Sequence, residues 1–240
     1  MLKNSIKVLL LQATHINKNC MEQRKITFYS SGNMNIKDAK GEINTNTNAG
    51  VAIVINNELL NYITDKGQIS DRTMTITLGH IMPITFINNY SPTATNYTIE
   101  NETEHYDKLK KILQKQKSKG PTYIMGDFNA RVQKKVNEQE KCVGEHTFDK
   151  HRDRIGERAT DYPTRENREI FINFCNEIDA SIINTCFQKP DDKLMTYKQN
   201  STNIGPPYDR DRYEQIDYVV VPDRWKNSIT KCETDTKQSY

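Results

Sequence analysis

The chain has 240 residues, with 34 lysines and arginines against 31 aspartates and glutamates, and its formal net charge is +3. That length suits one sizeable α/β domain, so we expect a single domain over residues 1–240. The small net charge does not demand a polyanionic partner, and a composition of 35% hydrophobic and 27% charged residues falls short of the disordered class.

Strands dominate the first ninety residues. Ile6–Gln12 and Gly50–Asn56 are apolar runs typical of buried strands, and Lys25–Ser30 alternates like a half-exposed strand. Arg72–Leu78 has the clearest two-residue alternation in the chain, and Ile84–Asn88 follows it after a short turn. We expect these last two strands to be antiparallel neighbours.

The same segments bear on localisation. The longest apolar stretch near the start, Val8–Leu11, is far too short for a membrane span or for the core of a signal peptide. We therefore expect an intracellular protein, nuclear or cytoplasmic, that is not secreted and has no membrane partner. The five cysteines include no C-x-x-C pair, which argues against a disulfide framework and against a zinc site.

An amphipathic surface helix is expected from Asn101 to about Lys117, because apolar residues recur on one helical face. Asn101 and Glu104 resemble a capping box at its start. A short strand at Thr122–Met125 then leads the chain directly into the tetrapeptide Gly126-Asp127-Phe128-Asn129.

The last third of the chain also combines a helix with strands. A second amphipathic helix is expected around Ile170–Ile178, followed by strands at Ser181–Thr185, Leu194–Tyr197 and Ile216–Val221. Strands outnumber helices, and the helices have the character of crossover connections. The predicted fold is α/β (α+β): two mainly antiparallel β-sheets packed as a sandwich and flanked by helices.

The tetrapeptide at Gly126 combines residues suited to a phosphate or metal site. Glycine lets the backbone turn sharply, Asp127 supplies a carboxylate for a divalent cation or a water proton, and Asn129 supplies an amide for phosphate oxygens. The alternative is an ordinary Gly-Asp turn closed by a side-chain hydrogen bond.

Two further strand ends carry polar groups. Tyr90, in Asn89-Tyr90-Ser91-Pro92, has a hydroxyl that suits a phosphate oxygen, although half-buried packing is the commoner role of such a tyrosine. Asp217, in Gln215-Ile216-Asp217-Tyr218, places a carboxylate within an apolar strand, where an unpartnered charge is costly. The alternative for Asp217 is a capped turn or an ion pair with Arg210 or Arg212.

These motifs occur in an order that resembles the endonuclease/exonuclease/phosphatase superfamily. The stretches LLLQATH, FCNEIDASIINTCF and QIDYVVVPDRW are similar to the non-LTR retroelement branch of endonuclease domains, and the resemblance runs from about Val8 to Trp225. It implies a DNase I-like fold, a four-layer sandwich, and hydrolysis of nucleic-acid phosphodiester bonds by an in-line water with Mg²⁺ or Mn²⁺.

The resemblance also implies roles for four residues. Asp127 is expected to position or deprotonate the attacking water and to ligate the metal, Asn129 to hold the scissile phosphate and to ligate the metal, and Tyr90 to contact that phosphate. Asp217 is expected to orient a histidine. The implied partners are DNA and, in a complete element, a reverse-transcriptase domain.

The chain departs from that pattern at Ala13, where a Gln-Glu pair is expected and the sequence reads Gln12-Ala13. Alanine cannot ligate a cation, so weak metal binding is expected. The resemblance also expects an earlier strand with an asparagine and a Ser-Asp-His segment after Asp217, whereas all five histidines precede Asp217. We therefore expect a domain truncated at both ends, with weak or absent activity.

Two alternatives are a non-catalytic module that binds nucleic acid or protein, and a phosphatase that acts on a phosphate ester. Clustered basic residues suit phosphate binding in either case, although a solvated surface explains many such clusters. They are the lysines of the helix from Lys108 to Lys119 and a group after the tetrapeptide: Arg131, Lys134, Lys135, Arg152, Arg154 and Arg158.

Overall fold

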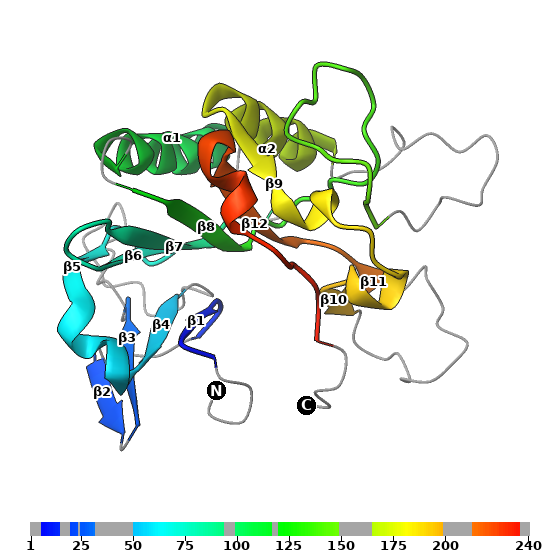
Figure 1. The fold of residues 1–240 in the computed structure, drawn as a ribbon. Coiled ribbons are helices and arrows are strands. Elements are labelled where there is room, and N and C mark those ends of the chain that lie inside the picture. The colour runs from blue at the N-terminus through cyan, green and yellow to red at the C-terminus, as the bar shows by residue number, and fades with distance from the viewer. Residues whose placement is uncertain are drawn as a thin grey trace. The chain divides into compact units, whose positions relative to one another are not determined.

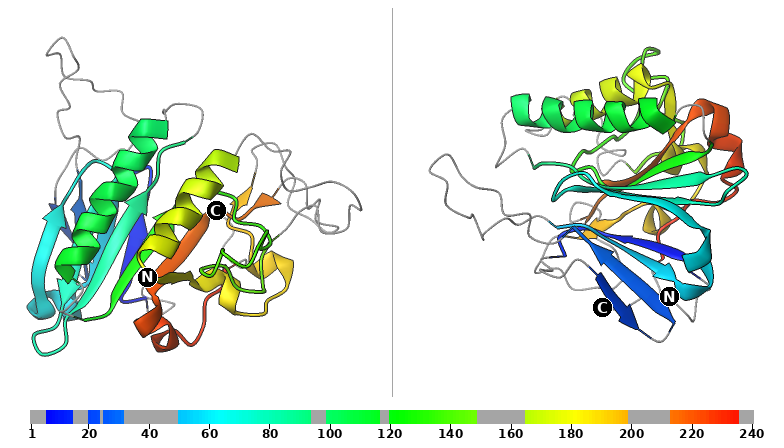
Figure 2. Two further views of the ribbon diagram at one scale, coloured as in Figure 1. Left: turned by 90° about the horizontal axis from the view of Figure 1, so that it is seen from above. Right: turned by 90° about the vertical axis from the view of Figure 1, so that its left-hand side faces the viewer.

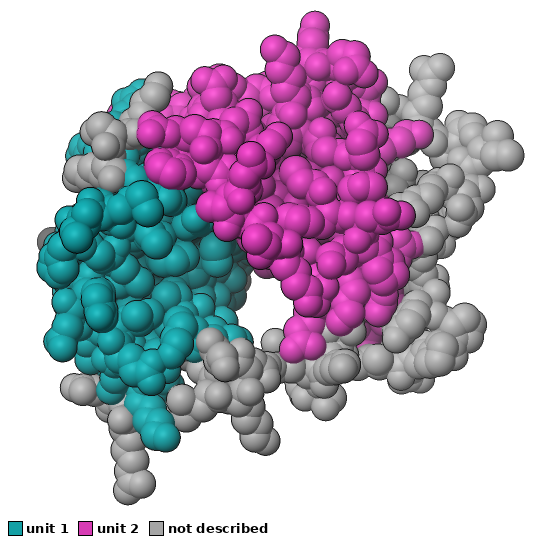
Figure 3. Space-filling model, viewed as in Figure 1, with its two compact units in different colours: residues 1–91, 112–127 teal, residues 92–111, 128–240 magenta. Residues whose placement is uncertain are grey.

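A computed structural model describes residues 6–14, 20–23, 25–31, 50–93, 99–116, 120–148, 165–198 and 213–235. The chain divides into two compact units, which Figure 3 shows in different colours. The first unit comprises Met1–Ser91 and Ile112–Asp127, and the second comprises Pro92–Lys111 and Phe128–Tyr240. One of the three boundaries between the units falls inside the Gly-Asp-Phe-Asn tetrapeptide, between Asp127 and Phe128.

The first unit contains a four-stranded antiparallel sheet (Figure 1). Its strands are β1 (Val8–Leu11), β2 (Cys20–Gln23), β3 (Ile26–Ser30) and β4 (Ala52–Asn56), in the order β1-β4-β3-β2. β4 lies between β1 and β3 and is buried along its whole length, which agrees with its continuous apolar sequence.

The second sheet of this unit contains β5 (Ile63–Gln68), β6 (Thr73–Leu78), β7 (Ile84–Tyr90) and β8 (Thr122–Asp127), in that order. A 3-10 helix, η2 (Asn57–Tyr62), connects β4 to β5. β5, β6 and β7 pair antiparallel, whereas β7 and β8 pair in parallel. A parallel pair needs a crossover, and α1 (Ile99–Gln116) lies between the two strands in the chain.

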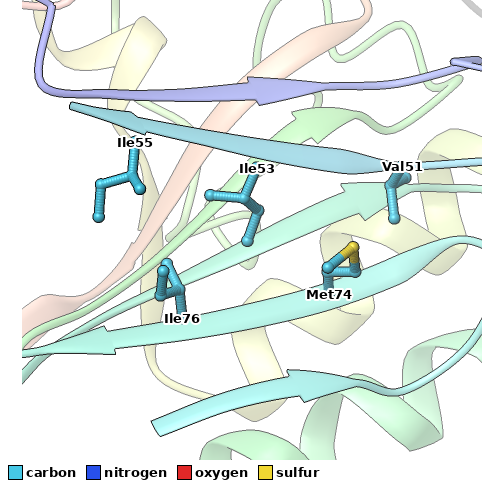
Figure 4. Packing of buried hydrophobic residues seen from close by; sticks show 5 residues of the cluster. All are labelled: Val51, Ile53, Ile55, Met74 and Ile76. Atoms are coloured by element: carbon cyan, nitrogen blue, oxygen red, sulfur yellow. The ribbon is translucent and has the colours of Figure 1, made fainter. Parts of the chain in front are cut away.

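A hydrophobic core lies between the two sheets of the first unit (Figure 4). Val51, just before β4, and Ile53 and Ile55 of β4 point toward Met74 and Ile76 of β6. All five are buried, and side chains two residues apart share one face of a strand, so each sheet presents one apolar face to the other. Figure 2 shows the two sheets face to face.

The second unit is organised around aromatic packing. α2 (Arg165–Glu177) runs beside α1 (Figure 2), and β9 (Ala180–Ile182) pairs antiparallel with β12 (Asp217–Pro222). Buried rings from both helices, from the tetrapeptide and from β12 pack together with ring centres 4.4 to 6.3 Å apart: Tyr106, Phe128, Phe171, Phe174 and Tyr218.

The remaining elements of the second unit are short. They are the strands β10 (Tyr197–Lys198) and β11 (Tyr213–Glu214), which pair with each other, and the 3-10 helices η4 (Ile183–Cys186), η5 (Asp191–Lys193) and η7 (Asp223–Ser228). Neither described helix combines the length and the hydrophobicity that crossing a membrane requires.

The predicted fold class is confirmed: the described residues form two main sheets, both mainly antiparallel, together with flanking helices and the small sheet of β10 and β11. Three details were wrong. The strand expected at Ser181–Thr185 ends at Ile182 and continues as η4, and Leu194 is a buried residue after η5 rather than part of a strand. α1 begins at Ile99, so Asn101 lies within its first turn and is not the capping residue.

Candidate functional site

Tyr90 and Asp127 lie side by side in the first unit. Each is the last residue of its strand, and the parallel register of β7 and β8 places Tyr90 directly opposite Asp127. The backbone N–H of Ser91 donates to the carbonyl of Asp127 at 2.8 Å, which extends the pairing past both strand ends. Because carboxyl ends of parallel strands meet at one edge, both half-buried side chains belong to the edge where such folds bind ligands.

Gly126 allows β8 to approach β7 closely. Its φ of +146° lies in a region that residues with a side chain rarely adopt. A Cβ atom at this position would lie 1.9 Å from the backbone oxygen of Asn89 and 3.0 Å from the Gln12 amide nitrogen. The glycine of the tetrapeptide is therefore required by backbone packing, and Gln12 lies close to it.

Gln12 belongs to a buried amide network at the end of β1. Its amide nitrogen donates to the Asn88 side-chain oxygen at 2.5 Å. The Asn88 amide donates in turn to the carbonyls of Leu11 and Ala52, at 2.9 and 2.8 Å. Asn88 is fully buried, and its bonds join the two sheets of the first unit beside Gly126. Sequence reasoning missed Asn88, because an isolated polar residue in a strand carries no periodic signal.

Ala13 follows Gln12 directly and is exposed. Its φ of 50° is left-handed, and the N–H of the next residue, Thr14, donates to the Gly50 carbonyl at 3.0 Å. The Thr14 hydroxyl oxygen is buried and has no hydrogen-bond partner in the described part of the chain. At the position where a carboxylate ligand is expected, the structure offers a methyl group and a neutral hydroxyl.

These donors do not fit a tight Mg²⁺ site. Hard divalent cations depend on several oxygen ligands and on their negative charge. Within the described ranges, no three His, Cys, Asp or Glu side chains lie close enough together to hold an ion. Asp127 supplies one carboxylate, and the position that should add a second holds Ala13.

The Tyr90 ring is packed as well as placed at the strand end. It packs against the core between the sheets, and the Arg72 guanidinium lies over it at 4.8 Å from the ring centre. The Tyr90 N–H also donates to the Arg72 carbonyl at 2.9 Å. The Tyr90 ring therefore has the half-buried packing that was the alternative to phosphate binding. Arg72 adds a positive charge beside Tyr90 that sequence reasoning did not identify.

Asn129 and Asp217 lie next to one backbone hydrogen bond in the second unit. The Phe128 N–H donates to the Ile216 carbonyl at 2.9 Å. Asn129 follows Phe128 and Asp217 follows Ile216, so each of them is next in the chain to one partner of this bond. Asn129 has a φ of 47°, which asparagine tolerates better than most residues, and its carbonyl accepts from the Asn167 amide at 3.1 Å.

Asp217 begins β12 and has a hydroxyl partner. The Thr196 Oγ1 accepts the backbone N–H groups of Ile216 and Asp217, each at 3.1 Å. Burial raises the pKa of the Asp217 carboxyl, and a hydrogen bond with Thr196 lowers it only in part. Such a carboxyl favours a basic partner. Arg210 and Arg212, the alternative ion-pair partners expected for Asp217, lie outside the described residues. Sequence reasoning missed Thr196.

An ion pair fixes the loop after the tetrapeptide. Arg168 of α2 binds Glu140 with two hydrogen bonds, at 2.6 and 2.7 Å, and also donates to the carbonyls of Val132 and Lys134, at 2.6 and 3.1 Å. Burial alone would raise the pKa of Glu140, but the bonds from Arg168 and from the Val136 N–H leave it below its usual range. Both charged side chains are nearly buried, at 9% and 10% exposure.

The basic clusters are mostly paired where the structure describes them. Arg131 binds the buried Glu214 at 2.8 Å, and Lys135 binds Glu138 at 3.2 Å. In α1, Lys108 binds Glu104 at 2.9 Å. Lys110 binds both Asp107 and Glu177. These pairs favour the solvated-surface alternative for α1. Outside the described residues lie Lys117, Lys119, Arg152, Arg154 and Arg158.

Comparisons with known proteins give a consistent result. A family profile described as "Endonuclease/Exonuclease/phosphatase family" matches residues 8–237. Craniofacial development protein 2 from Bos taurus is 28% identical over 187 residues, which cover 77% of this chain and 27% of that protein. The chain thus spans little more than a quarter of the length of this curated relative.

Two solved structures share the fold. An AP endonuclease from Archaeoglobus fulgidus aligns with a TM-score of 0.60 at 15% identity, covering 98% of this chain and 83% of that one. The endonuclease domain of TRAS1, a telomere-specific non-LTR retrotransposon, aligns with a TM-score of 0.50 at 11% identity, covering 94% and 77%. At these identities the likeness establishes the fold, which is the DNase I-like fold that the motifs implied.

Proposed function

The chain belongs to the endonuclease/exonuclease/phosphatase family, and from this premise we propose that it is a nucleic-acid phosphodiesterase domain by descent, with weak metal-dependent activity. One observation carries the proposal: Tyr90 and Asp127 are paired at the edge of the first unit's sheet, while an exposed Ala13 follows Gln12 beside Gly126. Tyr90 and Asp127 supply polar groups that suit a phosphodiesterase site, and Ala13 does not supply the expected carboxylate ligand.

Each residue has a role that its chemistry supports. Asp127, a half-buried carboxylate, accepts a proton from the attacking water as the water oxygen bonds to phosphorus and the bond to the leaving oxygen breaks. The Asn129 amide and the Tyr90 hydroxyl donate to non-bridging phosphate oxygens, which stabilises the charge of the transition state. Asp217, which the family resemblance expects to orient a histidine, has a hydrogen bond with Thr196 in the described part of this chain.

We propose Mg²⁺ or Mn²⁺ as a weakly bound cofactor, because Asp127 and Asn129 supply the expected ligands and Ala13 does not. DNA is the proposed substrate. A retroelement is the proposed origin, with a reverse-transcriptase domain as the neighbour in the complete element. The stretches LLLQATH, FCNEIDASIINTCF and QIDYVVVPDRW support that origin. The whole chain, residues 1–240, is proposed to act as one catalytic domain.

Exposed Ala13 also favours a second candidate, a non-catalytic module that binds nucleic acid on the same fold. Such a module would bind oligonucleotides with a strong salt dependence and no turnover. No described feature favours the phosphatase alternative over these two.

Plasmid nicking by the purified chain tests the proposal. We expect slow nicking in Mg²⁺ or Mn²⁺, none in EDTA, and a loss of at least about 100-fold in Asp127→Ala, because general acid–base groups contribute roughly 10²–10⁴-fold. Circular dichroism of both proteins controls for folding. Nicking that survives Asp127→Ala, or a folded chain that never nicks, would contradict the proposal, and the second outcome would favour the binding module.

A further inference from the structure

The second unit contains a cavity of about 300 Å³ that none of the proposed catalytic residues lines. Its wall is formed by Lys134 from the loop after the tetrapeptide, by the segment from Glu145 to Thr147, and by Lys189 and Leu194. Lys134 belongs to the basic group that the sequence singles out. The volume of the cavity reaches the lower end of the range for small-molecule sites.

Backbone contacts hold the walls of this cavity in place. The Gly144 N–H donates to the Thr185 hydroxyl at 2.7 Å, and the His146 N–H donates to the Thr185 carbonyl at 3.0 Å. At Lys134, the backbone carbonyl accepts from Arg168, which is itself fixed by Glu140. Hydrogen bonds therefore fix the backbone of two of the segments that line the cavity.

The charges around the cavity favour an anion. Two lysines, Lys134 and Lys189, face it together with one glutamate, Glu145, and with His146. Lys189 also lies 3.2 Å from Glu233, but Glu233 is shared with Lys231 at 2.7 Å, so it does not fully offset Lys189. Lysine is a common binder of phosphate as a compact point charge.

One of the residues that line the cavity, Leu194, is apolar. Leu194 is 3% exposed and belongs to a small hydrophobic cluster that also contains Phe148, Met195 and Tyr213. Thr147, also buried, adds a hydroxyl beside it. A cavity lined by two lysines and a leucine suits a ligand that carries both an anionic group and an apolar part.

We propose that this cavity is a subsite for one nucleotide of a nucleic-acid strand, in which Lys134 and Lys189 bind the phosphate and Leu194 contacts the sugar or base. The choice of a nucleic-acid strand as the source of that nucleotide rests on the proposed function. Lys134 lies five residues after Asn129, so at ~3.6 Å per residue their Cα atoms are at most ~18 Å apart. A strand that rises ~3.4 Å per nucleotide covers this distance in about five nucleotides.

The test is a calorimetric titration of the full chain in EDTA with thymidine 5′-monophosphate, inorganic phosphate or thymidine. We expect the monophosphate to bind most tightly and thymidine at least about tenfold more weakly. Lys134→Ala should weaken monophosphate binding about tenfold, as expected for one charge-assisted contact, and Lys189→Ala should act in the same direction. Lys141→Ala is the matched control, because Lys141 is exposed on the same loop and does not line the cavity.

Thymidine binding as tight as the monophosphate, or an unchanged affinity in both lysine variants, would overturn the inference. Inorganic phosphate that binds as tightly as the monophosphate would overturn the nucleotide assignment. Monophosphate binding by Asp127→Ala separates the two proposals. If Asp127→Ala binds the monophosphate and the wild-type chain does not nick DNA, the proposed function fails and the subsite stands. If nicking depends on Asp127 and the chain does not bind the monophosphate, the subsite fails and the proposed function stands.

Discussion

Gly126→Ala is expected to lower the free energy of unfolding by about 3–5 kcal/mol, the sum of an unfavourable φ and an overpacked contact. The new Cβ would lie 1.9 Å from the Asn89 carbonyl oxygen, which is backbone and part of the β7–β8 pairing. One of the two strands must therefore move. For a chain of this length the expected fall in Tm is roughly 10 °C, measured by circular dichroism.

Gly67→Ala is the control for this substitution. Gly67 also lies in a strand of the first unit, but its Cβ would meet the Thr75 side-chain hydroxyl, at 2.7 Å, rather than a backbone atom. A rotation of Thr75 relieves that contact, so a smaller loss of stability is expected. Equal Tm values for Gly126→Ala and wild type would contradict the close approach of β8 to β7.

Arg168→Ala is expected to destabilise the chain by about 3–5 kcal/mol, because removing one member of a buried ion pair leaves the other charge buried and unpaired. Two carbonyls, of Val132 and Lys134, lose their donor at the same time. The expected fall in Tm is again roughly 10 °C. The loss should shrink in acid, because a carboxyl with a lowered pKa such as Glu140 stabilises the fold above its unfolded pKa and ceases to do so as the pH falls through its folded pKa.

Two further variants isolate the cause. Lys135→Ala breaks the exposed pair with Glu138, which is 97% exposed, and should change stability by less than about 1 kcal/mol. The double variant Arg168→Leu/Glu140→Leu should recover part of the loss, because it leaves no unpaired charge. A Tm for Arg168→Ala within the range of Lys135→Ala would show that this ion pair does not hold the loop.

Hydrophobic periodicity predicted most of the strands. Thr73–Leu78 shows why: threonine alternates with Met74, Ile76 and Leu78, and the apolar residues form one core face. Leu194 shows the limit of the method, because it is just as buried but follows a 3-10 helix, and short apolar runs do not distinguish a strand from a turn.

The sequence predicted only those residues of the candidate site that lie at the ends of recognisable apolar strands. Tyr90 and Asp127 follow apolar strands, so their placement at strand ends could be predicted, and the structure pairs them. The groups that hold the site are polar and isolated in sequence. Asn88 and Arg168 act through bonds to partners at least 28 residues away, and no local pattern signals such contacts.

Mg²⁺-dependent plasmid nicking by Ala13→Glu, measured beside Ala13→Gln, tests whether the missing carboxylate at position 13 limits activity. Ala13 is exposed and already has a Cβ at a φ of 50°, so neither substitution adds backbone strain. Because loss of a supporting group alone costs roughly 10–100-fold in metal affinity, Ala13→Glu should nick at least about tenfold faster than wild type and need less Mg²⁺, while Ala13→Gln stays at the wild-type rate. A glutamate variant no faster than the glutamine variant would contradict the claim that the residue at position 13 limits activity.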